Sequence, residues 1–171
     1  MFSSLFPAAL TNFAVKPDGT LLAAIMNTPQ GGSTLQIANI ASGGAISLTP
    51  LSATVTNPSG LAISSKGVLA ITDLNNFTVQ LFTVQNNLLV TRGSAATGAL
   101  PQDAVFSADG KTLYVGNDGD GTVSVFSVSD GGALQLVHTA RFFVPSGGPG
   151  VAIVRARSRG RLWTVCFMLL T

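Results

Sequence analysis

The amino-acid sequence predicts an all-β protein built from repeated, four-stranded antiparallel units. Short apolar runs alternate with tight turns, and no stretch shows convincing helical periodicity. A pattern also recurs along the chain, with a shared glycine at Gly19, Gly67 and Gly110, which gives spacings of 48 and 43 residues. A period in this range fits one four-stranded blade. We therefore expect a β-propeller-like array of such blades with an incomplete ring.

Each repeat opens with two apolar runs on either side of a tight turn, which is typical of a β-hairpin. These paired runs cover residues 12–25, 60–73 and 103–117. Third strands, which alternate apolar and polar residues at period two, are expected at 34–40, 78–84 and 122–128. Less regular fourth strands are expected at 45–48, 87–91 and 134–139.

A length of 171 residues favours a single domain. Its units are expected at about 12–56, 57–100 and 101–148, with an incomplete fourth at 149–171. In the fourth, residues 149–153 resemble an innermost strand and 161–165 a second strand. Because this unit stops halfway, we expect a fragment whose end is truncated or shifted, although a divergent blade or a basic surface hairpin would also fit. Exposed end blades invite pairing, so two copies could close one ring as a homodimer.

Charge is sparse and unevenly distributed. Charged residues make up 9% of the chain, and the formal net charge is +2. Four arginines fall between Arg155 and Arg161, whereas residues 1–154 hold five basic and seven acidic groups. A slightly acidic body argues against nucleic acid as a partner. The single cysteine, Cys166, excludes a disulfide scaffold and a cysteine-based zinc site. The sequence contains no convincing signal peptide or transmembrane segment, so localisation stays open.

Most carboxylates are expected to form turns. Five of the seven aspartates stand directly before glycine, and there is no glutamate. Aspartate followed by glycine supplies the positive φ that two-residue hairpin turns require. These five residues are Asp18, Asp109, Asp118, Asp120 and Asp130. The remaining acids, Asp73 and Asp103, are the candidates for a polar site.

The third unit contains Tyr-Val-Gly-Asn at 114–117 and Thr-Val-Ser-Val at 122–125, after Ser-Ala-Asp-Gly-Lys-Thr at 107–112. This segment resembles the YVTN-type β-propeller repeat, and the second unit is a fair match to it. Proteins with this repeat include the lactonase-like seven-bladed propellers and related binding propellers. The resemblance covers about residues 12–140, and the chain as a whole would hold about three and a half blades. It implies the WD40/YVTN repeat-like propeller fold and leaves the function open between these two classes.

The resemblance also implies where a site would lie, because propeller ligands usually bind at the mouth of the central channel. The segments leading into the innermost strands are 57–60, 101–103 and 145–149. Lactonase-like proteins often carry a histidine here and an Asp-Leu-Gly segment after the second strand. This chain has Asp73-Leu74-Asn75 at the latter place, but Asp103 where a histidine is expected.

Asp73 and Asp103 are therefore the weak catalytic candidates: they could orient water or bind a cation, or each could simply cap a strand end or bond to a neighbouring blade. His138 falls in an expected outermost strand, away from the channel. With no second histidine, no Ser-His-Asp arrangement can be argued. The segment 117–121 lacks the spacing of a calcium loop, and 147–150 lacks the residues of a phosphate loop. We expect no cofactor and no metal.

Two functions remain. The first is a repeat-based binding or interaction scaffold for an unknown small molecule or protein ligand. The alternative is a lactone hydrolase, 6-phosphogluconolactonase-like, in which residues near Asp73 and Asp103 activate water at the channel mouth.

Overall fold

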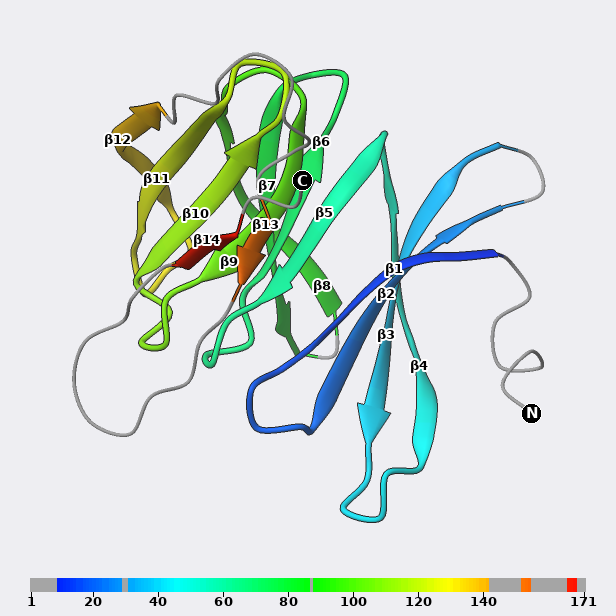
Figure 1. Ribbon diagram of the computed structural model, residues 1–171. Coiled ribbons are helices and arrows are strands. Elements are labelled where there is room, and N and C mark those ends of the chain that lie inside the picture. The colour runs from blue at the N-terminus through cyan, green and yellow to red at the C-terminus, as the bar shows by residue number, and fades with distance from the viewer. Residues whose placement is uncertain (1–8, 29–30, 87, 142–151, 155–165, 169–171) are drawn as a thin grey trace.

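The computed structural model describes residues 9–28, 31–86, 88–141, 152–154 and 166–168 (Figure 1). Every regular element in these ranges is a strand, and no helix that could cross a membrane occurs there. The first sheet contains β1 (Ala9–Val15), β2 (Leu21–Asn27), β3 (Ser33–Ile40) and β4 (Ile46–Val55). The second contains β5 (Pro58–Ile63), β6 (Leu69–Asp73), β7 (Thr78–Gln85) and β8 (Leu88–Ala96). The third contains β9 (Pro101–Phe106), β10 (Thr112–Asn117), β11 (Thr122–Val128) and β12 (Leu134–Arg141).

Each sheet is an antiparallel meander in which the strands neighbour one another in chain order. A further pair, β13 (Ala152–Val154) and β14 (Cys166–Met168), is antiparallel. The all-β class and the array of four-stranded antiparallel sheets are thus confirmed, and the three sheets of the described residues do not close a ring. The expected segments at 145–149, 155–160 and 161–165 lie outside the described residues.

The third strands agree with the alternating pattern in the sequence, whereas the fourth strands are longer than expected. In all three sheets the pairing of the third and fourth strands shifts register at a bulge. These shifts lie between Gln36 and Ala38, between Leu81 and Phe82, and between Val125 and Phe126. A bulge puts two residues opposite one, so the side chains change face partway along the strand. The alternation of apolar and polar residues is therefore interrupted at the bulge, and the sequence pattern does not show where the strand ends.

Three of the five aspartate–glycine pairs form turns with positive φ at the glycine. The φ angles are 75° at Gly19, 68° at Gly110 and 64° at Gly121. The expectation is wrong for the other two pairs, because Gly119 and Gly131 do not have positive φ. Gly119 is instead tightly packed, because a Cβ there would lie 3.0 Å from the Leu100 Cγ and 3.1 Å from the Ala99 carbonyl oxygen, whereas a Cβ at Gly131 has only an ordinary 3.8 Å contact.

The middle sheet is buried on both faces, as Figure 1 shows for its place between the other two sheets. Along β6, Leu69 and Ile71 join one apolar cluster with the first sheet. Ala70 belongs to a second cluster shared with the third sheet, which also includes Phe106 and Phe126. Because alternate residues of a strand point to opposite faces, a strand buried on both sides must be apolar throughout. All five residues of β6 are buried, and its polar exceptions stand at the end that leads to the site.

The innermost strands meet where the sheets converge. β5 contacts both β1 and β9. Gly60 on β5 comes so close to the third sheet that a Cβ atom there would lie 2.7 Å from the carbonyl oxygen of Gln102 and 3.0 Å from the Cα of Asp103. Thr72 adds a hydroxyl that accepts a hydrogen bond from the Gly60 amide, at 2.6 Å. This close approach fixes the spacing between the second and third sheets.

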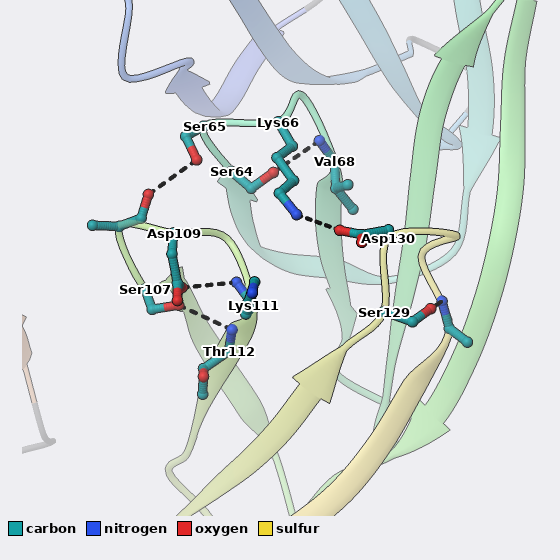
Figure 2. Close-up of polar contacts among 12 residues, drawn as sticks. Ser64, Ser65, Lys66, Val68, Ser107, Asp109, Lys111, Thr112, Ser129 and Asp130 are labelled. Atoms are coloured by element: carbon teal, nitrogen blue, oxygen red, sulfur yellow. Dashed lines mark hydrogen bonds and ion pairs between the residues drawn. The ribbon is translucent and has the colours of Figure 1, made fainter.

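At the other end of the strands, hairpin turns join the second and third sheets (Figure 2). Lys66 forms an ion pair with Asp130, and the Ser65 hydroxyl donates to the carbonyl of Ala108 at 3.0 Å. Ser64 accepts a hydrogen bond from the backbone amide of Val68, and similar serine contacts recur in two further turns. Exposed ion pairs contribute little to stability. The packing at this end comes instead from Val68, Phe106 and Val128, which stand beside the turns and are buried in the apolar cluster shared by the second and third sheets.

Substitution of Gly60 by alanine is expected to lower the free energy of unfolding by about 1–3 kcal/mol, because the added methyl group meets backbone atoms that cannot move aside. Gly93 in β8 is the matched control, since a Cβ there has only an ordinary 3.9 Å contact. Urea unfolding measures both variants. Equal midpoints for Gly60→Ala and Gly93→Ala would contradict the close approach.

Candidate functional site

A cavity of about 220 Å³ opens between the first and second sheets, at the end of the strands opposite the turns in Figure 2. Cross-strand pairing builds one wall, because Ile71, Gln80 and Ser94 lie side by side on neighbouring strands, as do Asp73 and Thr78. The linker from β4 to β5 completes the cavity. The residues that line it are Val55, Thr56, Ile71, Asp73, Asn76, Thr78, Gln80 and Ser94.

Asp73 ends β6 and holds the turn and the linker together. Its Oδ2 accepts hydrogen bonds from the Thr56 hydroxyl at 2.6 Å and the Asn76 side-chain amide at 2.8 Å. Its Oδ1 accepts from the backbone amides of Asn75 at 3.1 Å and Asn76 at 3.0 Å. Since a carboxylate has about four acceptor positions, these four bonds occupy its capacity. The residue as a whole is 9% exposed.

These hydrogen bonds set the ionisation of Asp73. Burial alone raises the pKa of this carboxyl, but the donors from Thr56, Asn76 and Asn75 outweigh burial and hold the pKa below its ordinary value. Asp73 is therefore charged at neutral pH. A carboxylate with a lowered pKa and no free acceptor position is a poor general base. The geometry favours a positioning role for Asp73 over activation of water.

Polar groups free to meet a ligand come from other residues of the wall. Thr78, Gln80 and Ser94 form no side-chain hydrogen bond with another described residue. Sequence reasoning missed these three residues, as well as Thr56 and its bond to Asp73. The missing signal was the cross-strand pairing, which brings residues separated by 5 to 23 positions next to one another.

One part of this arrangement recurs in all three sheets. The second strand ends on Asn27, Asp73 or Asn117, opposite a hydroxyl residue at or next to the start of the third strand. In the first sheet the Ser33 hydroxyl donates to the side-chain Oδ1 of Asn27 at 3.0 Å, and in the third sheet the Asn117 side-chain amide donates to the Thr122 hydroxyl at 2.9 Å. In the second sheet Asp73 and Thr78 stand opposite each other without such a hydrogen bond. Only the second sheet uses a carboxylate at this position.

The corresponding region of the third sheet is filled. Asn117 is 2% exposed and donates to Thr122 and Ser124, and its Oδ1 has no partner among the described residues. Asp120 accepts from the backbone amide of Ala99 at 3.0 Å. A Cβ at Gly98 would lie 2.6 Å from both the Asn117 amide and the Asp120 carboxylate. Glycine at this point lets the two polar side chains fill the space that is open in the second sheet.

Asp103 lies on β9, the innermost strand of the third sheet, and part of its surface is exposed to solvent. Neighbouring atoms partly remove its carboxyl from water, and this partial desolvation, together with the nearby Asp118 carboxylate, raises its pKa. Its electrostatic neighbour is thus Asp118, whereas the hydrogen bonds of Asp73 go to the linker between the first two sheets. The two sequence candidates do not share hydrogen bonds or hydrogen-bonding partners. His138 is exposed on β12, the outermost strand.

The Asp120 carboxylate also accepts from the backbone amide of Thr122 at 3.2 Å, so this segment forms a closed turn. No group of three or more His, Cys, Asp or Glu side chains that could hold a metal ion occurs among residues 9–28, 31–86 and 88–141 or in the short β13–β14 pair.

The stacked four-stranded sheets, with their first strands innermost, define a β-propeller architecture. Residues 19–151 match the family described as lactonase, 7-bladed beta-propeller, and the chain belongs to this family. No curated protein matches the chain.

Solved structures share the fold at low sequence identity. A protein from Lactobacillus plantarum is 19% identical, with a TM-score of 0.59, over 82% of this chain and 45% of that one. A candidate 6-phosphogluconolactonase from Bacteroides fragilis is 19% identical, with a TM-score of 0.64, over 78% of this chain and 39% of that one. Another, from Bacteroides uniformis, is 16% identical, with a TM-score of 0.58, over 87% and 63%. The chain spans about half the length of these structures.

Replacement of Asp73 by asparagine is expected to lower the free energy of unfolding at neutral pH by about 1–3 kcal/mol, because one amide oxygen cannot serve four donors. A lowered folded-state pKa stabilises the protein above the unfolded pKa of about 3.9, and this contribution is lost as pH falls through the folded value. Urea unfolding between pH 3 and 7 should show Asp73→Asn losing most at pH 7. The exposed Asp118→Asn is the control; an equal loss there would contradict the assignment.

Proposed function

We propose that this chain is a repeat-based binding scaffold whose ligand is a small polar molecule held in the cavity between the first two sheets. The observation that carries the proposal is the cavity wall itself. It combines three polar side chains, Thr78, Gln80 and Ser94, that are not committed to other described residues with an anchored carboxylate. Convergent polar groups in a concave site are the usual mark of ligand recognition.

The size and rigidity of the cavity support the same function. Its volume of about 220 Å³ lies below the range of roughly 300–1,000 Å³ that suits drug-sized molecules. Asp73 fixes Thr56 and Asn76, so two sides of the cavity are preorganised before a ligand arrives. Preorganised groups lose less entropy on binding. We infer a ligand no larger than a single sugar ring.

A second function, lactone hydrolysis, is favoured by Asp103. Its raised pKa, its exposure on the innermost strand and the adjacent Asp118 suit a general base. In this proposal the Asp103 carboxylate takes a proton from water as the water oxygen bonds to the lactone carbonyl carbon. The ring ester C–O bond then breaks, and the alkoxide takes up a proton to give a hydroxy acid. The family name and the candidate 6-phosphogluconolactonases among the structural relatives support this alternative.

Ligand binding is tested by titration of the folded chain with uncharged monosaccharides, followed by NMR of backbone amides. Shifts should concentrate at Thr78, Gln80 and Ser94. Ser94→Ala is expected to weaken binding at least tenfold, about 1.4 kcal/mol, because it removes a hydroxyl group from the cavity wall without changing the size of the cavity much. Thr139→Ala is the matched control, because Thr139 holds the corresponding place in the third sheet, opposite Ser124. Equal weakening by both variants, or shifts scattered over the molecule, would contradict the binding site.

Hydrolysis is tested with a panel of simple and phosphorylated sugar lactones. If Asp103 is the base, Asp103→Asn should lower the rate by about 10²-fold or more, and the wild-type rate should fall as pH drops through the raised pKa. Asp109→Asn, in an exposed turn at the other end of the strands, is the control. A wild-type rate equal to the buffer blank in a folded sample excludes this alternative and leaves the binding function standing.

A further inference from the structure

The cavity wall carries one negative charge and no positive charge. Of the eight residues that line it, Asp73 is the only one with an ionisable side chain, and none is lysine, arginine or histidine. The nearby hydrogen bonds keep Asp73 ionised at neutral pH. A ligand that enters therefore meets one fixed negative charge and otherwise neutral polar groups.

That charge cannot be masked easily by the ligand. All four acceptor positions of the Asp73 carboxylate are taken by protein donors, so hydroxyl groups of a ligand have no free position on it. The donors hold the carboxylate in place and leave its net charge unchanged. An anion would lose water on entering and would find no cation to replace that water. Desolvation and like-charge repulsion act in the same direction.

Among the residues that the structure describes, no basic side chain lines the cavity. Lys16 is paired with Asp18, Lys66 with Asp130, and Arg92 donates to the Thr83 hydroxyl.

The position of the charge is specific to this site. In the third sheet the equivalent of Asp73 is the neutral Asn117, and the carboxylate stands instead at Asp120 in the turn. The two sheets thus exchange acid and amide, since Asn76 occupies the turn of the second sheet. Only the second sheet places the acid at the strand end beside an open cavity.

We propose that the cavity between the first two sheets selects uncharged or cationic polyhydroxyl molecules of single-ring size and rejects phosphorylated and carboxylate-bearing ones. The inference rests on the proposed binding function and narrows it to a ligand class. The proposed ligand class differs from that of phosphate-binding sites, which in proteins rely on arginine, lysine or clustered backbone amides.

Four stable probes with the same six-membered ring test the inference: glucose, glucosamine, glucuronate and glucose 6-phosphate. NMR titration of the whole chain at pH 7 gives the dissociation constant of each probe at Thr78, Gln80 and Ser94. Glucose and glucosamine are expected to bind at least tenfold more tightly than glucuronate and glucose 6-phosphate. The gap should shrink as salt rises, because ions screen the repulsion between the carboxylate and the anionic probes.

A gain-of-function variant keeps the test independent of the stability of Asp73 variants. Ser94 is exposed at the cavity rim, so Ser94→Lys adds a cation without disturbing the core. This variant should bind glucose 6-phosphate at least tenfold more tightly than wild type, whereas Thr139→Lys, at the corresponding exposed place in the third sheet, should not.

The outcomes separate the two proposals. Similar affinity of the wild-type cavity for glucose and glucuronate would overturn charge selection and leave the binding function intact. Absence of local shifts with all four probes would overturn both. A gain in phosphate binding that is equal in Ser94→Lys and Thr139→Lys would show that the cavity charge is not what excludes anions.

Discussion

The structure depends on the need of each sheet to have its apolar faces covered by a neighbouring sheet. The middle sheet meets this requirement on both sides, through Leu69 and Ile71 against the first sheet and Ala70 and Leu81 against the third. Burial of one large aliphatic side chain contributes about 1.5–3 kcal/mol. Small residues at the convergence of the sheets, above all Gly60, let the innermost strands approach closely enough for this packing.

The cavity follows from the same arrangement. Where the sheets diverge toward the ends of the strands, apolar packing gives way to polar side chains, and the space is either filled or left open. In the third sheet, Gly98 admits Asn117 and Asp120, and the space is filled. In the second sheet, Asp73 accepts hydrogen bonds from Thr56 and from the residues of the turn that follows β6, and a cavity remains. The second and third sheets thus carry the acid and the amide at exchanged positions. The third sheet has a filled structural contact at this place, and the second sheet has the candidate binding site.

Much of the fold could be predicted because hairpins and alternating strands leave local signals. The third strands at 78–84 and 122–128 were recognisable from period-two alternation. The extent of the fourth strands was not, because a bulge in each third–fourth pair changes the face of the side chains. For the site, Asp73 was identified as a polar candidate, but its partner Thr56 lies 17 residues away and belongs to a linker.

Local residue patterns are enough to predict the all-β class, the four-stranded repeat and the small set of carboxylates not followed by glycine. These features depend on turn chemistry and strand alternation, which a few neighbouring residues encode. Long-range packing is needed to saturate Asp73 with four donors and to place Asp103 near Asp118. Long-range packing also brings Thr78, Gln80 and Ser94 together on one wall. The reason is physical: cross-strand register and sheet-to-sheet spacing bring distant residues together, and neither is set by any single segment of the chain.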